Sequence, residues 1–169
     1  HPEALSPGAA LDRGWCLMDL DRPVEAAAVF EVALRSTAAA TRRDAAYGAA
    51  LAYLRAGLTD RAAVAITQAE QSESRVREVQ AAILAQRATS AYADGRYREA
   101  ILALDERARI VRGEQNDLMM IRGYSHLELG QLLAARAIFE AVAATGHPDA
   151  IQALANVENL STISMEPAR

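Results

Sequence analysis

The chain has 169 residues, of which 51% are hydrophobic, 5% aromatic and 24% charged, and its formal net charge is −4. Because arginine and acidic residues are interleaved, this balance argues against a protein that binds a nucleic-acid backbone, which requires a basic face. The single cysteine, Cys16, excludes an internal disulfide framework.

All of the predicted elements are helices. Alanine, the best helix former, supplies much of the apolar content, and runs of strand-forming residues are sparse. Ser6-Pro7 is a helix start signal. In chain order, helices are predicted over residues 9–20, 23–35, 41–56, 59–71, 74–93, 97–111, 117–129, 132–144 and 148–159, and residues 161–169 are predicted to be a flexible tail.

A pattern of small and large apolar residues repeats four times along these helices. An alanine follows the turn before every second helix, at Ala26, Ala62, Ala100 and Ala135, with spacings of 36, 38 and 35 residues. Four residues after these alanines stand large apolar residues, namely Phe30, Ile66, Leu104 and Phe139. Twelve residues before the alanines stand small ones, namely Gly14, Ala50, Ala88 and Gly123.

Helix packing explains this pattern. A small residue in the first helix is expected to face a small residue in the second, so that the two backbones approach closely, and the large residue fills the groove between them. Gly57, Gly95 and Gly130 are expected to end first helices, and Pro23 suits the first turn of a second helix. One such pair cannot bury its apolar face alone, so neighbouring pairs must stack.

The chain therefore resembles the tetratricopeptide repeat family, whose helix–turn–helix units have about 34 residues. The residues that carry the resemblance are Gly14, Leu17, Ala26, Phe30, Ala33, Tyr53, Gly57, Ala62, Ala69, Gly95, Tyr97, Ala100, Ile101, Gly123, Gly130, Ala135, Phe139 and Pro148. The departures are Ala10, Ala46, Leu84 and Met119, where the family has a large aromatic residue, and Arg107, where it has a small one.

This resemblance implies an all-α, right-handed α-solenoid over residues 9–160. It would consist of four repeats, over residues 9–38, 41–73, 74–112 and 116–146, and a helix over 148–159. That last helix is expected to be a cap or the first half of a fifth repeat.

The residues give no sign of catalysis. No glycine-rich phosphate loop, cysteine pair or serine nucleophile motif is present. His1 is terminal, His126 has no second histidine nearby, and His147 precedes a proline in a loop. We therefore predict a protein that is not an enzyme and that has no catalytic residues, metal or cofactor.

In the family, the first helices line a concave groove that usually holds a bound peptide. Alignment predicts the corresponding groove residues here to be Leu11, Trp15, Met18, Tyr47, Leu51, Leu54, Arg55, Tyr92, Met120, Tyr124 and Leu127. For Trp15 and Tyr92, packing against the neighbouring repeat is an equally good interpretation. For Tyr47 and Tyr124, contact with a partner is favoured over packing against the neighbouring repeat. The carboxylate clamp of chaperone-adaptor members is missing, because its columns hold Leu11, Trp15, Gly48 and Ala82.

Two functions of different class remain open. The first is a non-catalytic scaffold for a protein or peptide partner, in the style of periplasmic repeat domains of bacterial exopolysaccharide and cellulose export proteins. The second is a module of the same machinery that stacks its aromatic residues on a polysaccharide. Converging rings would favour a peptide and widely spaced rings a glycan. An RNA-binding repeat protein is a weaker third interpretation, because no basic column is present.

The compartment predicted from this resemblance is the periplasm, with the cytoplasm as the alternative. No membrane-spanning segment is predicted, because the longest apolar stretch, residues 45–54, is about half of a membrane span. The N-terminal residues lack the basic and apolar regions of a signal peptide.

Overall fold

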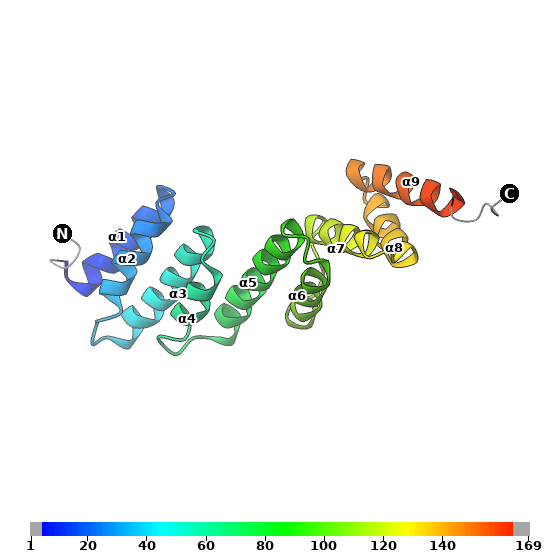
Figure 1. Ribbon diagram of the computed structural model, residues 1–169. Helices are drawn as coiled ribbons and strands as arrows, with labels where there is room; N and C mark the ends of the chain where they lie inside the picture. Colours follow the sequence, from blue (N-terminus) through cyan, green and yellow to red (C-terminus); the bar gives the residue numbers. More distant parts are fainter. Residues whose placement is uncertain (1–4, 164–169) are drawn as a thin grey trace. The chain divides into compact units, whose positions relative to one another are not determined.

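The computed structural model describes residues 5–163, with side chains described as far as residue 159 (Figure 1). Within these residues the chain forms nine helices and no strand, so the all-α prediction is confirmed. The helices are α1 (Pro7–Asp19), α2 (Pro23–Ala33), α3 (Ala39–Arg55), α4 (Thr59–Ala65), α5 (Glu73–Ala93), α6 (Tyr97–Ile110), α7 (Asn116–Glu128), α8 (Leu132–Ala143) and α9 (Pro148–Ile163).

Two helices end at places that the sequence does not predict. The predicted helix over 59–71 ends at Ala65, where the Thr67 hydroxyl donates to the Val64 carbonyl at 2.8 Å and the following amides form tight three-residue turns. The helix expected to end at 159 continues to Ile163, so residues 161–163 are helical rather than part of a tail. The rest of the predicted tail, 164–169, lies outside the described residues.

The four turns between the helices of a pair share one hydrogen-bonding pattern. The N–H groups of Arg22, Leu58, Arg96 and Gln131 donate at 2.8 or 2.9 Å to the carbonyls of Leu17, Tyr53, Ala91 and His126. The residue before each of these donors has a left-handed φ, which is 54° at Asp21, 74° at Gly57, 73° at Gly95 and 71° at Gly130. This is the Schellman arrangement, which satisfies the last carbonyls of the first helix and reverses the chain.

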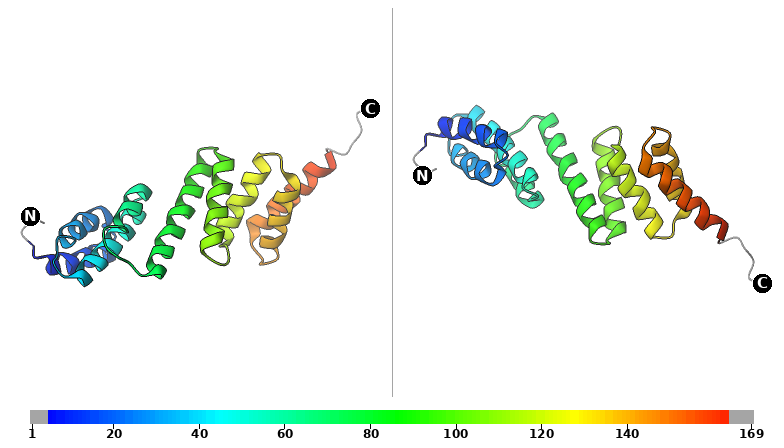
Figure 2. Two further views of the ribbon diagram at one scale, coloured as in Figure 1. Left: turned by 90° about the horizontal axis from the view of Figure 1, so that it is seen from below. Right: turned by 90° about the horizontal axis from the view of Figure 1, so that it is seen from above.

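The described chain divides into two compact units, and the boundary lies between residues 86 and 87 inside α5. In the first unit, α1 packs on α2, α2 on α3 and α3 on α4, and α1 also contacts α3. In the second unit, α6 packs on α7, α7 on α8 and α8 on α9. Figure 2 shows the antiparallel pairs α1–α2 and α7–α8 from two further directions.

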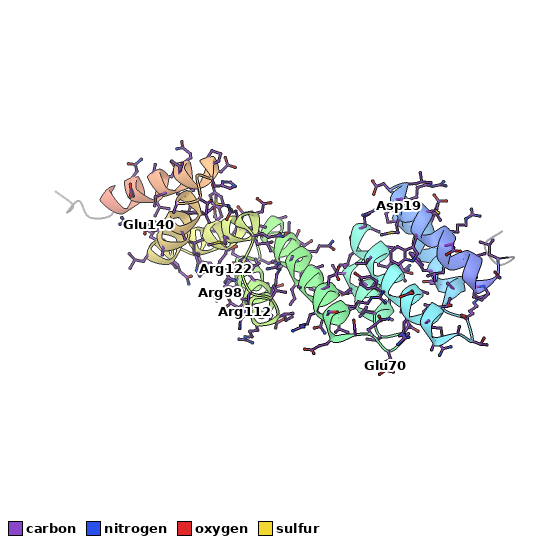
Figure 3. The ribbon with its side chains drawn as sticks, turned by 180° about the vertical axis from the view of Figure 1, so that it is seen from behind. Asp19, Glu70, Arg98, Arg112, Arg122 and Glu140 are labelled. Atoms are coloured by element: carbon purple, nitrogen blue, oxygen red, sulfur yellow. The ribbon has the colours of Figure 1, made fainter. Side chains whose placement is uncertain are left out.

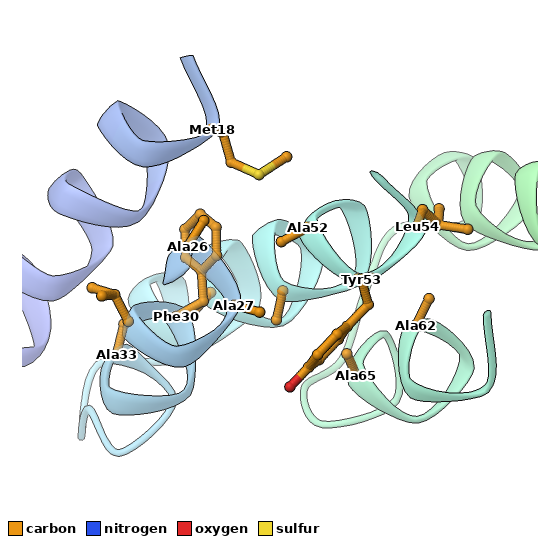
Figure 4. Close-up of a cluster of buried hydrophobic side chains, with 14 of the residues drawn as sticks. Met18, Ala26, Ala27, Phe30, Ala33, Ala52, Tyr53, Leu54, Ala62 and Ala65 are labelled. Atoms are coloured by element: carbon orange, nitrogen blue, oxygen red, sulfur yellow. The ribbon is translucent and has the colours of Figure 1, made fainter. Parts of the chain in front are cut away.

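The core of the first unit is built around the Phe30 ring, which α2 inserts between α1 and α3 (Figure 4). A Cβ atom added at Gly14 of α1 or at Gly48 of α3 would lie less than 3.0 Å from three atoms of this ring. The second unit repeats the contact, because a Cβ at Gly123 would lie 2.5 Å from Cε1 of Phe139. Glycine therefore accommodates an aromatic ring, whereas the sequence predicts that it faces another small residue.

The other repeated positions are buried as the packing argument requires. The alanines that follow the four turns, Ala26, Ala62, Ala100 and Ala135, are all 0% exposed. The large residues four positions later, Phe30, Ile66, Leu104 and Phe139, are buried as well. The same environment therefore recurs in all four helix pairs.

An ion-pair network holds the connection between α6 and α7 in the second unit. Arg122 of α7, labelled in Figure 3, donates from Nε to Glu114 Oε2 at 2.9 Å and from Nη2 to Glu114 Oε1 at 3.2 Å. Its third nitrogen donates to Asp105 of α6. Because the side chains of Arg122 and Glu114 are only 15% and 16% exposed, this pair is shielded from solvent.

Candidate functional site

The predicted groove residues are divided between the two units. The first unit holds seven of them, namely Leu11, Trp15, Met18, Tyr47, Leu51, Leu54 and Arg55. The second unit holds the other four, namely Tyr92, Met120, Tyr124 and Leu127.

In the first unit, four of these residues form one apolar patch, which we call the Trp15–Tyr47 patch. Leu11 and Trp15 are one turn apart on α1, and Tyr47 and Leu51 are one turn apart on α3, so each pair shares a helix face. All four are half-buried and pack against the core. The ring centroids of Trp15 and Tyr47 are 6.5 Å apart, with planes inclined at 49°. The two rings therefore converge.

A charged frame from the beginning of α5 fixes the Tyr47 ring. The Tyr47 hydroxyl donates to Glu78 Oε2 at 2.8 Å, and the Arg75 guanidinium carbon lies 4.5 Å from the ring centroid. Arg75 also pairs with Asp44 of α3 at 2.8 Å. Burial and the bond to Glu78 raise the pKa of Tyr47 above 10.0. This frame was not predicted, although Arg75 and Glu78 lie one helical turn apart in the sequence.

Three of the predicted contact residues belong to the core instead. Met18 and Leu54 in the first unit and Met120 in the second are only 7%, 6% and 8% exposed, so they offer little surface to a partner. Arg55 is exposed, and its Nη1 donates to the Met18 carbonyl at 2.7 Å. It therefore satisfies a carbonyl at the end of α1.

Trp15 and Tyr124 occupy equivalent places in the two units. Each residue follows a buried glycine and lies edge-on to the aromatic ring that this glycine accommodates. The centroid distance is 5.1 Å from Trp15 to Phe30 and 5.0 Å from Tyr124 to Phe139. Tyr47 contacts Trp15 of the neighbouring pair, against the expectation for it. The ring contact of Tyr124 is with Phe139 of its own pair, so the expectation for Tyr124 stays a prediction.

The remaining predicted residues of the second unit are half-buried. Leu127 packs against the core of that unit. Tyr92, at the end of α5, lies 5.8 Å from Tyr97, at the start of α6, measured between ring centroids. This contact is with the second helix of its own pair, so packing of Tyr92 against the neighbouring repeat stays a prediction.

Sequence reasoning missed a surface cleft of about 790 Å³ between α2 and α4. Tyr53 of α3 lies in it, donates its hydroxyl to Glu31 of α2, and has the Arg61 guanidinium of α4 5.7 Å from its ring centroid. Val64 is 59% exposed there, and an exposed valine on an otherwise alanine-rich helix was the available signal. The lining residues are Glu31, Leu34, Ala49, Tyr53, Asp60, Arg61, Val64, Ala65 and Gln68.

Two features are absent from residues 5–163, a cluster of metal ligands and a helix that could span a membrane. No group of three histidine, cysteine, aspartate or glutamate side chains there could hold a metal ion. Between residues 5 and 163, no helix has both the length and the apolar character needed to cross a bilayer. His126 Nδ1 lies 2.5 Å from Gln131 Oε1, and the Cys16 thiol is exposed.

Comparison with known proteins assigns part of the chain to a described repeat type. No curated protein and no solved structure matches the chain. Residues 85–155, from the second half of α5 into α9, match a family model described as tetratricopeptide repeat. The Schellman turn and the buried alanine of this segment recur in residues 17–26 and 53–62, outside the match. The match supports a tetratricopeptide repeat protein.

Proposed function

We propose that this chain is a non-catalytic interaction module that binds an extended or helical segment of a partner protein on the Trp15–Tyr47 patch. Tetratricopeptide repeats generally mediate protein–protein interaction and are typically non-catalytic. The observation that carries the proposal is the convergence of two half-buried rings, 6.5 Å apart, with the apolar side chains of Leu11 and Leu51 one helical turn from them. Partly buried aromatic residues of this kind are typical anchors in protein interfaces.

The geometry favours a peptide over a polysaccharide. A sugar that stacks on an aromatic residue needs an open ring face. One face of Tyr47 is covered by Arg75 at 4.5 Å, and Trp15 is engaged with Phe30 at 5.1 Å. Apolar side chains of a peptide can instead pack on the surface that the four half-buried residues of the patch leave open, next to the charged groups of Asp44 and Glu78.

Trp15 gives this proposal a built-in reporter, because it is the only tryptophan. Peptides selected from a random library on the full chain, and a series of oligosaccharides in parallel, are titrated while Trp15 emission is recorded. We expect the peptides to shift the emission saturably. Leu51→Glu, which charges the patch, should weaken them at least tenfold, or by about 1.4 kcal/mol. Val64→Glu, a matched change in the α2–α4 cleft, should leave the affinity unchanged.

The outcomes separate the alternatives. If the peptides lose affinity with Val64→Glu and keep it with Leu51→Glu, the cleft is the binding surface and the proposal is wrong. If only oligosaccharides shift the emission, the glycan-contacting function replaces it.

We also propose that the module works in the periplasm, in an assembly that exports a polysaccharide across a bacterial envelope. The support is the alanine-rich, lysine-free composition of divergent repeats that resembles such proteins. Fractionation of native cells that express a tagged full-length protein tests this. Release by osmotic shock is expected, and retention with cytoplasmic markers would contradict it.

A further inference from the structure

Three of the five tyrosines gather in the second unit. Tyr92 ends α5, Tyr97 begins α6, and Tyr124 lies on α7. The rings of Tyr92 and Tyr97 are 5.8 Å apart and inclined at 57°, so they form two walls of a corner. Tyr124 is held edge-on against Phe139, which fixes its ring. All three tyrosines are half-buried and therefore keep part of their surface open.

The repeat register brings a carboxylate to this corner. Each first helix has a small residue at its centre, and positions can be counted from it. Met18 and Tyr92 both lie four positions after that residue, and Arg55 and Glu128 both lie five positions after it. Arg55 contacts Met18 in the first unit, with 2.7 Å between its Nη1 and the Met18 carbonyl oxygen. Glu128 is thus expected beside Tyr92.

The electrostatics of Tyr92 agree with this placement. Burial and the negative charge of Glu128, followed by Tyr97 and Tyr124, raise the pKa of the Tyr92 hydroxyl above 10.0. All of these influences act in one direction, and no arginine is among them.

The first unit contains a comparable group of a ring, a cation and a carboxylate. There the Arg75 guanidinium lies 4.5 Å from the Tyr47 ring centroid, and the Tyr47 hydroxyl is bound to the carboxylate of Glu78. In the first unit the chain itself therefore supplies the cation and the carboxylate that contact the ring of Tyr47. At the corner of the second unit the rings and Glu128 are present, but the neighbouring Arg96 is engaged by Asp94 at 2.8 Å and by Glu99. Over the part of the chain that the structure describes, Glu128 forms no ion pair.

We propose that Tyr92, Tyr97, Tyr124 and Glu128 form a binding site for an organic cation. The ligand group is an alkylated ammonium or a guanidinium, supplied by a lysine or arginine side chain of a partner or by a free quaternary ammonium compound. The ring faces attract the cation through their quadrupoles, and the carboxylate adds a charge interaction. The site lies in the second unit and shares no residue with the Trp15–Tyr47 patch, so the two proposals can be tested independently.

The experiment is a titration of the full chain labelled with fluorotyrosine and followed by ¹⁹F NMR, with each signal assigned from a Tyr→Phe variant. Choline is compared with 3,3-dimethylbutan-1-ol, which has the same shape without the charge. We expect saturable, millimolar binding of choline that shifts the Tyr92 and Tyr97 signals, and at least tenfold weaker binding of the neutral alcohol. Equal binding of the two compounds, or no saturation by choline, would overturn the proposal.

Variants test the two components separately. Glu128→Gln should weaken choline by about 2- to 5-fold, and Tyr92→Leu by a similar factor, whereas Tyr92→Phe should retain the affinity because the ring remains. Glu106→Gln removes a matched exposed carboxylate of α6 and should change nothing. If Tyr92→Leu does not fold, Glu128→Gln decides, since Glu128 is exposed. Unchanged affinity in Glu128→Gln refutes the site.

The source of the cation is read from the same assay. The capped amides of lysine and arginine are titrated beside choline. Tighter binding of an amide assigns the site to a side chain of a partner segment, and tighter binding of choline assigns it to a free ammonium compound. Failure of all three cations rejects the proposal and leaves peptide binding at the Trp15–Tyr47 patch untouched.

Discussion

Replacing Gly14 by alanine should destabilise the first unit, although alanine is the better helix former. In an exposed helix interior this change gains about 1 kcal/mol. At Gly14, however, the new Cβ would lie less than 3.0 Å from three atoms of the Phe30 ring, which is itself 0% exposed and cannot move into solvent. Overpacking of this kind costs about 1–3 kcal/mol. Because this contact is a severe clash with a fixed ring, we expect a net loss of about 1–2 kcal/mol.

The control lies in the same helix. Gly8 of α1 has nothing within 4 Å of an added Cβ, so Gly8→Ala should be neutral or stabilising. Both variants are unfolded with urea while Trp15 fluorescence, which reports on the first unit, and helical circular dichroism are followed. Adding Phe30→Leu to Gly14→Ala should recover part of the loss, which a double-mutant cycle measures as coupling. Stabilisation by Gly14→Ala equal to that by Gly8→Ala would show that the Phe30 ring does not clash with a Cβ at residue 14.

Three further predictions concern stability. Asp21 adopts a left-handed φ of 54°, so Asp21→Gly should raise the free energy of unfolding by about 0.5–1 kcal/mol, whereas Gly57→Ala, at φ 74°, should lower it by about 1 kcal/mol in the same urea assay; the opposite signs would contradict the turn geometry. Arg122→Ala strands the shielded Glu114 carboxylate and should cost about 3 kcal/mol in thermal unfolding, and a loss below about 0.5 kcal/mol would show that the pair is solvated. Burial and the bond to Glu31 raise the pKa of Tyr53 above its unfolded value of 10.0, so its contribution is present below pH 10.0 and is lost as pH rises further; Tyr53→Phe should flatten this alkaline loss in stability curves, and an unchanged slope would count against it.

The repeated packing could be predicted from the sequence because its chemistry is local. Three features recur at fixed spacings along the chain and can be recognised from the sequence alone. They are a glycine or aspartate after a helix, an alanine five or so residues later, and a large apolar residue one turn beyond. The sequence did not predict which residue each helix glycine contacts. Gly48 lies outside the predicted columns, yet it touches the same Phe30 ring as Gly14, because that contact depends on how closely α1, α2 and α3 cross.

The candidate site was only partly predictable, for a related reason. The resemblance to the family implied that Trp15 and Tyr47 lie on the groove side of first helices, and the rings do meet. The same spacing could not tell whether Met18, Leu54 and Met120 face a partner or the next helix, since one helix face serves both. The α2–α4 cleft is lined in part by Gln68, which lies beyond the end of α4 at Ala65, whereas the sequence pattern predicts that this helix continues to residue 71.

The most direct test of the account is hydrogen–deuterium exchange of the full chain with and without a selected peptide. If the first helices carry the interaction surface, bound peptide should slow exchange in residues 11–18 of α1 and 44–54 of α3, with the segments of α2 and α4 unchanged. Protection confined to residues 29–34 and 60–68, around the α2–α4 cleft, would contradict it.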